Sequence, residues 1–256
     1  MTDIADWYRT VPQFTRYWLS ATVGLSLIAR FGLLPHYYLI LWWDFVVYKL
    51  QLWRIVTAVF YYPLTPQTGF HFMLNCYFLY NYSLKLEKEQ FQNKPSDYLF
   101  LLIFNWLNCV LIGLFFELTL LMDPMVLSVL YVWCMLNRDV VVNFWFGTQF
   151  KAVFLPWVLL GVNLILSGGA FYSLAGILVG HLYYVLKFKY PEDTGRPSYI
   201  ETPNILKQYY PDISGGVYGF GAAPAFRRTN ATNQQRPAGR SLFGDRWGRG
   251  DVLGGN

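Results

Sequence analysis

Charged side chains are scarce in this 256-residue chain, at 14% of all residues. Soluble domains usually carry about a quarter of their residues as charged ones, so the shortage argues against a soluble globular protein. Hydrophobic residues make up 55% of the sequence, and several long stretches contain no Asp, Glu, Lys or Arg. The formal net charge of +5 belongs to the connections and the C-terminal part, and no nucleic acid partner is needed to explain it. The composition predicts a membrane protein.

Cysteine is almost as rare, with three residues in the chain. Cys76, Cys109 and Cys134 fall inside apolar stretches and show neither CxxC nor metal-ligand spacing. They argue against a disulfide scaffold and a zinc site, and are interpreted as small packing residues. We expect neither a metal nor any other cofactor. A cleavable signal peptide is not expected either, because the first apolar stretch follows Arg16 and lacks a small-residue cleavage site.

Six apolar stretches, together with abundant aromatic residues, predict an all-α membrane protein. Aromatic residues form 20% of the chain, and many stand where an apolar stretch meets charged residues, which is typical of membrane interfaces. The predicted helices cover residues 17–29, 69–84, 98–116, 124–136, 152–166 and 171–186. Several are shorter than the ~20 residues that a ~30 Å hydrocarbon core requires. Such helices would thin the bilayer locally or lie buried in the bundle.

The segment 31–56 is too long for a turn and too interrupted by charges for a span. Its aromatic and aliphatic residues suit short first-loop helices that lie in the membrane interface. The distribution of Lys and Arg favours both termini in the cytosol. In this topology the glycosylation sequons at Asn81 and Asn230 are cytosolic, so neither should be used.

The last apolar stretch contains Gly176-x-x-x-Gly180. Two glycines four residues apart on one helix face let a second helix approach closely within a membrane. The stretch resembles the final helix of rhomboid intramembrane proteases, which reads Ala-His-x-x-Gly-x-x-x-Gly and whose His is the catalytic base. When the sequences are aligned on the glycines, Ser173 occupies the position of that base.

Two other features resemble rhomboids. Trp53-Arg54 matches the Trp-Arg pair of the rhomboid first loop. Its guanidinium could tie several loop carbonyls together while the indole anchors the loop at the headgroups. His71-x-x-x-Asn75 places two polar side chains on one face of the second helix, where rhomboids use such a pair to stabilise an oxyanion. Polar groups inside a membrane are costly unless they face protein or water. The pair is therefore either a surviving oxyanion site or a structural relic that hydrogen-bonds across the bundle.

The nucleophile motif of rhomboids, Gly-x-Ser-Gly, is absent from the fourth stretch, where Ser128 stands between Leu127 and Val129. His181 is the candidate base in the sixth stretch. We interpret the chain as a rhomboid-like pseudoprotease that is not an enzyme. An active rhomboid-type serine protease with an unorthodox Ser–His pair is the main alternative. A channel or transporter is a third, disfavoured because the sequence shows no inverted repeat.

Strings spread over the membrane part resemble the Derlin family of endoplasmic-reticulum-associated degradation. They include Asp-Trp-Tyr-Arg at 6–9, Ser-Val-Leu-Tyr-Val-Trp at 128–133 and Phe-Trp-Phe-Gly-Thr at 144–148. The resemblance implies a protein of the endoplasmic reticulum membrane that helps to move misfolded luminal and membrane proteins to the cytosol for proteasomal destruction. It also implies partners: the misfolded substrates, the lipid bilayer, a membrane ubiquitin ligase complex, and further subunits of a homo- or hetero-oligomer.

A change in composition divides the chain into a membrane domain, residues 1–190, and a C-terminal part, residues 191–256. The C-terminal part is rich in Gly, Pro, Arg, Asn and Gln and has no sustained apolar period, which predicts a disordered cytosolic tail.

The end of this tail carries a short motif at 246–254, Arg-Trp-Gly-Arg-Gly-Asp-Val-Leu-Gly. It resembles the peptide by which Derlins recruit the valosin-containing AAA ATPase. Trp247 and Leu253 would fill pockets, while Gly248 and Gly250 would let the strand lie close to the receptor backbone. Because glycine-rich tails produce such strings by chance, a chance match stays open.

Overall fold

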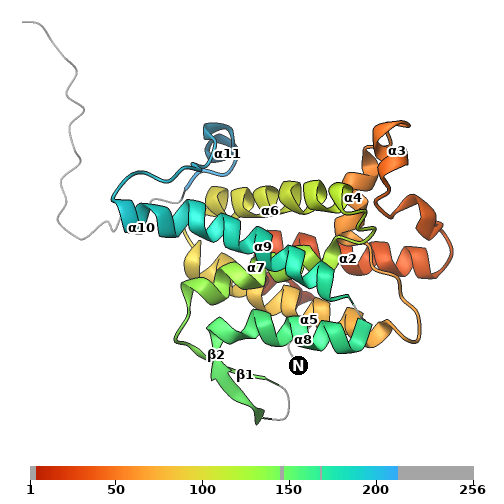
Figure 1. Cartoon of the computed structure of the whole chain (residues 1–256), viewed down its shortest axis with the longest axis horizontal. Coiled ribbons are helices and arrows are strands. Elements are labelled where there is room, and N and C mark those ends of the chain that lie inside the picture. The colour runs from red at the N-terminus through yellow and green to blue at the C-terminus, as the bar shows by residue number, and fades with distance from the viewer. Residues whose placement is uncertain (1–3, 145–146, 168, 213–256) are drawn as a thin grey trace, which may run out of the picture. The chain divides into compact units, whose positions relative to one another are not determined.

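A computed structural model describes residues 4–144, 147–167 and 169–212 of the chain. Helices dominate it, and each of the six predicted apolar stretches forms a helix (Figure 1). These helices are α2 (Gln13–Arg30), α5 (Gly69–Lys85), α6 (Pro95–Phe115), α7 (Met122–Leu136), α8 (Leu155–Ser167) and α9 (Ala170–Tyr184). Several begin before the apolar stretch because polar residues suit a first turn; α6, for example, starts at Pro95, whose missing N–H costs nothing there.

Two of the described helices are long and apolar enough to cross a membrane. They are α6 and the helix that starts as α9 and continues through a π-helical turn to Thr194. The stretches Met122–Leu136 and Ala152–Leu166 are apolar but shorter.

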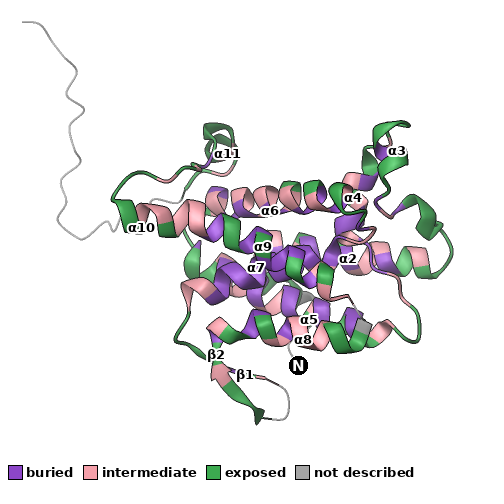
Figure 2. Ribbon diagram, viewed as in Figure 1, coloured by how far each residue is buried: buried purple, intermediate pink, exposed green. Residues whose placement is uncertain are grey.

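Helix α7 lies in the middle of the bundle (Figure 2). Its buried residues run almost without a break from Met122 to Cys134, and it contacts α4, α5, α6, α8 and α9. A helix that is apolar on all sides belongs in the interior. This position lets α7 organise the helices around it.

The glycine step of α9 lies directly against α7. A Cβ atom at Gly176 would stand 2.6 Å from the carbonyl oxygen of Pro124, and one at Gly180 would stand 2.6 Å from that of Ser128. Only glycine permits so close an approach of two helix backbones. The two residues therefore fix how α9 packs on α7.

The first loop contains a 3₁₀ turn (His36–Tyr38) and α3 (Trp43–Val47) before α4 (Trp53–Phe60) begins. Short helices were expected in this segment, but α4 runs past it and buries Ala58 and Val59 in the bundle. A further short helix, α1 (Ile4–Thr10), precedes α2.

The all-α prediction omitted one element. Strands β1 (Val141–Asn143) and β2 (Gln149–Lys151) form an antiparallel hairpin in which Val142 pairs with Phe150. The segment between α7 and α8 is rich in β-branched and aromatic residues, which favour strands.

The boundary expected at residue 190 lies too early in the chain. Helices α10 (Tyr190–Thr194) and α11 (Asn204–Tyr209) follow it. Ser96 Oγ donates to Asp212 Oδ1 at 2.7 Å, the Thr202 hydroxyl donates to Asp97, and the rings of Phe14 and Tyr210 are 5.2 Å apart. We call residues 196–212 the strap. These contacts of the strap come from isolated polar and aromatic side chains. Because the segment has no apolar periodicity, the sequence did not predict that it packs on the bundle.

Candidate functional site

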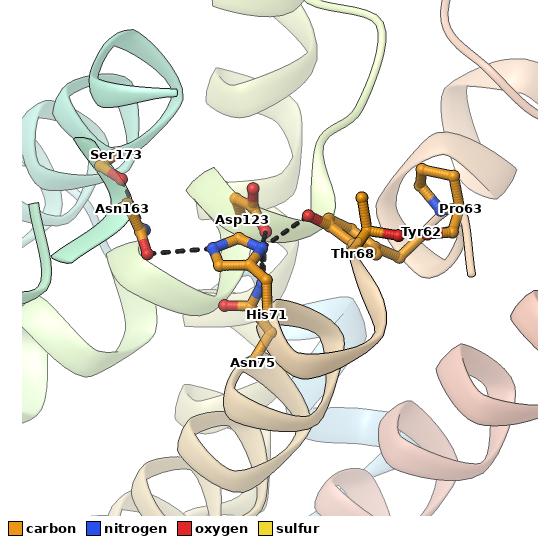
Figure 3. Close-up of polar contacts among 8 residues, drawn as sticks. All are labelled: Tyr62, Pro63, Thr68, His71, Asn75, Asp123, Asn163 and Ser173. Atoms are coloured by element: carbon orange, nitrogen blue, oxygen red, sulfur yellow. Dashed lines mark hydrogen bonds and ion pairs between the residues drawn. The ribbon is translucent and has the colours of Figure 1, made fainter. Parts of the chain in front are cut away.

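A chain of buried polar side chains crosses the bundle at the start of α5 (Figure 3). His71 and Asn75 are both buried, one helical turn apart. The hydroxyl of Tyr62, in the connection from α4 to α5, lies 2.6 Å from His71 Nδ1, and Asn75 Nδ2 lies 3.3 Å from the same nitrogen. Burial, and to a lesser extent the nearby Asp123 carboxylate, raises the pKa of Tyr62 above that of an ordinary phenol. Tyr62 therefore stays neutral and can donate.

From His71 the series of hydrogen bonds continues to side chains on two other helices. His71 Nε2 lies 3.0 Å from Asn163 Oδ1 on α8, and Asn163 Nδ2 donates to Ser173 Oγ on α9 at 2.7 Å. Two donors face Nδ1 and a carbonyl oxygen faces Nε2, so the partners assign the proton of a neutral imidazole to Nε2. Tyr62, His71, Asn163 and Ser173 thus form one polar chain, which satisfies groups that would be costly if left unpaired.

Asp123 completes the cluster from the first turn of α7. Its Oδ1 accepts a 2.5 Å hydrogen bond from Asn75 Nδ2 and lies 4.0 Å from His71 Nδ1. Asp123 lies between the predicted helices 98–116 and 124–136, and the structure leaves its side chain only 12% exposed. A cavity of about 10 Å³ beside it is lined partly by Asn75 and Asn163, and is about as large as one water molecule requires.

The described residues do not assemble a serine nucleophile with a histidine base. Ser128 is fully buried, and its hydroxyl donates to the carbonyl of Met125 on the same helix at 2.8 Å. His181 places Nδ1 2.8 Å from the hydroxyl of Tyr131. A nucleophile and its base must lie within hydrogen-bond reach, and within the described ranges no hydrogen bond joins Ser128 to His71 or His181. The geometry favours structural roles for these side chains.

Arg54 occupies the centre of the first loop. Its guanidinium is fully buried and donates to the carbonyl oxygens of Tyr37 at 2.5 Å and Ile40 at 2.9 Å, and to Gln51 Oε1 at 2.7 Å. The ring of Phe45 lies 4.6 Å from the guanidinium carbon. The neighbouring Trp53 is about half exposed. One side chain therefore links three separate points of an irregular loop.

Comparison with known proteins identifies the family of the chain. A family model described as the Der1-like family matches residues 11–204. The chain belongs to the Der1-like family. It is 49% identical to Derlin-1 of Homo sapiens over 254 residues, which cover 99% of each chain. It is 46% identical to Derlin-1 of Drosophila melanogaster, covering 99% of this chain and 100% of the relative. The resemblance to Derlins seen in the sequence is confirmed.

One stabilising residue of this Der1-like chain was not recognised from the sequence. Glu87, just after α5, accepts hydrogen bonds from the backbone N–H groups of Phe14 at 3.0 Å and Thr15 at 2.9 Å. A carboxylate here pairs with free donors in the first turn of α2 and favours its helix dipole. The partners are 72 and 73 residues apart, so local spacing gives no signal of the contact.

The C-terminal motif of the Der1-like chain lies outside the described residues. This applies to Trp247, Gly248, Gly250 and Leu253, and to the sequon at Asn230. Their assignments therefore stay predictions.

Proposed function

We propose that this Der1-like protein is a non-catalytic component of endoplasmic-reticulum-associated degradation, which moves misfolded luminal and membrane proteins to the cytosol. One observation carries the absence of catalysis: the polar cluster retains His71 and Asn75, but Ser173 stands at the base position and accepts a hydrogen bond from Asn163. The match to Derlin-1 over nearly the whole chain supports the pathway.

The proposed membrane arrangement has six rhomboid-like spans with both termini in the cytosol. Helix α7 has 15 residues and α8 has 13, so they extend only about 23 Å and 20 Å. Both lengths fall short of a ~30 Å hydrocarbon core. The bilayer would thin around them, which lowers the barrier to moving a polar chain across it.

The entry for a substrate is proposed beside α5 and the first-loop helices. The polar cluster offers hydrogen-bond donors and acceptors inside a bundle that is otherwise apolar. The hydrogen bond between His71 and Asn163 joins α5 to α8 within the cluster. An unfolded segment could replace that bond with its own backbone groups, so opening there would leave few polar groups unpaired.

The proposed driving force comes from the cytosol. The motif at 246–254 would recruit the valosin-containing AAA ATPase through Trp247 and Leu253. A membrane ubiquitin ligase complex would mark the emerging substrate. Further copies of the chain or of its relatives would complete the assembly.

An export assay tests the proposal. Cells that lack the endogenous protein receive the wild-type chain, Trp247→Ala or the matched control Arg249→Ala, and a glycosylated luminal reporter is followed. We expect Trp247→Ala to lose most ATPase binding, since a buried aromatic anchor contributes about 2 kcal/mol or more, and to leave the reporter in the membrane. Arg249→Ala should export it normally. Export that is the same with and without the wild-type chain would show that the protein does not act in this step.

A further inference from the structure

A groove separate from the polar cluster lies between the first parts of α2 and α6. It has a volume of about 380 Å³ and is lined by four residues of α2, three of α4, four of α6 and Met125 of α7. The lining residues fall within 14–21 on α2 and 99–106 on α6, which is about 10 Å along each helix. The groove therefore extends from near the starts of the two helices toward their middle.

The walls of the groove are apolar and bulky. Each lining residue is aliphatic, aromatic or a methionine. The indole N–H of Trp106 donates to the carbonyl of Ile55 at 3.0 Å, and Trp18 is buried. Ala21 is the smallest of the lining residues. Membrane helices pack closely where small residues let their backbones approach, so these walls suit a thin apolar chain better than another helix.

A cation stands beside the end of the groove where the helices begin. The guanidinium carbon of Arg16 lies 5.5 Å from the ring centroids of both Tyr8 and Tyr17, and Tyr17 lines the groove. Arg16 is partly exposed, and neither a hydrogen bond nor an ion pair joins its side chain to another described residue. Its N–H donors are therefore available to an anion.

The surroundings of Arg16 place it at the level of the lipid headgroups. The rings of Phe14 and Tyr98 are 5.9 Å apart, so α2 and α6 begin beside each other. Because α6 is long and apolar enough to cross a membrane, its start lies at the membrane surface. The exposed Lys94, just before α6, is a second cation there, and the Glu87 carboxylate already accepts hydrogen bonds from the backbone of α2. Basic residues in such a position attract phosphate headgroups.

From these observations we infer that the groove binds one phospholipid of the surrounding bilayer, with an acyl chain between α2 and α6 and the phosphate on the Arg16 guanidinium. A phospholipid has the two chemistries that the groove requires, an apolar chain and an anion at its end. Arginine pairs with phosphate through two parallel hydrogen bonds, and the rings of Tyr8 and Tyr17 hold the guanidinium in position. The chain supplies packing atoms that the groove otherwise lacks.

The test uses the purified full-length chain in detergent and two lipids with the same photoreactive acyl chains. One is a phosphatidylcholine, and the other is a diacylglycerol, which lacks the phosphate. Detergent removes the bulk bilayer, so labelling reports lipid that the protein holds. Mass spectrometry of peptides locates the label. We expect phosphatidylcholine to label residues 14–21 and 99–106 about threefold to tenfold more strongly than diacylglycerol does, because a hydrogen bond to a charged group adds to its affinity.

Arg16→Gln should reduce labelling by phosphatidylcholine to the level of diacylglycerol, whereas Arg16→Lys, which keeps the cation, should retain most of it. Arg30→Gln is the matched control, because Arg30 is exposed at the other end of the same helix. It should be labelled like the wild type. Ala21→Phe narrows the groove and should lower labelling by both lipids. Ala29→Phe, about two turns further along α2 and outside the groove, should not.

Equal labelling of the wild type by the two lipids, or unchanged phosphatidylcholine labelling in Arg16→Gln, would overturn the assignment of a phospholipid to this groove. Label spread evenly over the membrane helices and unaffected by Ala21→Phe would also overturn it, since that pattern shows lipid covering the surface without a specific site. Thermal melting in the same detergent checks that each variant is folded before it is labelled.

Discussion

Arg54 shows how much one buried side chain can hold in place. It meets two carbonyl oxygens and the Gln51 side chain, and the Phe45 ring covers it at 4.6 Å. Lys49 lies over the same ring at 4.5 Å but is exposed. Lys49 and Arg54 both contact the Phe45 ring, but only Arg54 is buried. Comparing substitutions at the two residues therefore separates the effect of the ring contact from that of the hydrogen bonds of Arg54.

Replacing Arg54 with Gln should lower the free energy of unfolding by at least about 2 kcal/mol, because hydrogen bonds from a charged donor contribute about 1.5–3 kcal/mol each. Lys49→Gln should change it little. Thermal unfolding of both purified variants in the same detergent checks the pair. Equal losses of stability would mean that the ring contact, not the carbonyl contacts, carries the effect.

At Ser128 the local geometry predicts no reaction with serine-directed reagents. Its hydroxyl is buried and donates a hydrogen bond to the carbonyl of Met125, and within the described residues no hydrogen bond joins it to a histidine. Membranes that contain the protein should show no fluorophosphonate labelling at its mass, while an active serine hydrolase added to them is labelled. A labelled band that disappears in Ser128→Ala would establish an active nucleophile and contradict the non-catalytic proposal.

At the scale of helices, the most informative feature is the close packing of α9 on α7. Gly180 stands against the backbone of Ser128, where a Cβ atom would come within 2.6 Å of the carbonyl oxygen. Gly161 on α8 has no atom within 4 Å of a Cβ position. The same substitution should therefore destabilise the protein at Gly180 and not at Gly161.

Gly180→Ala should destabilise the protein by about 1–3 kcal/mol, the usual cost of overpacking. Gly161→Ala should leave stability unchanged or raise it by up to about 1 kcal/mol, since alanine favours a helix. Melting temperatures in one detergent compare them. If Gly180→Ala has the same melting temperature as the wild type, α7 and α9 do not pack as closely as the structure shows.

The six apolar helices could be predicted because freedom from charge over a dozen or more residues is a local signal. The polar cluster could be predicted only in part. His71 and Asn75 share one helix face, but Tyr62, Asp123 and Asn163 come from three other elements. For Asn163, the available signal was that an isolated polar residue stands in the apolar stretch 152–166, which indicates that it faces a polar partner inside the bundle. Which groups meet depends on helix packing, and no spacing within one helix determines that.

At the scale of the whole molecule, the proposed topology has both termini in the cytosol. Asn81 should remain unglycosylated, as should Asn230, and a tag after Asn256 should be digested by protease added outside sealed microsomes. A tag inserted after Leu33, an exposed first-loop residue, should stay protected until detergent is added. Glycosylation at Asn230, or protection of the terminal tag, would invert this topology.

The strap has a mechanical consequence. Because Thr202 is hydrogen-bonded to Asp97 and Asp212 to Ser96, the described end of the strap is held at the beginning of α6. If the proposed ATPase pulls on the chain beyond Asp212, the force would first act on these two hydroxyl contacts and on the ring contact between Phe14 and Tyr210. Tension would then pass into α6 and α2.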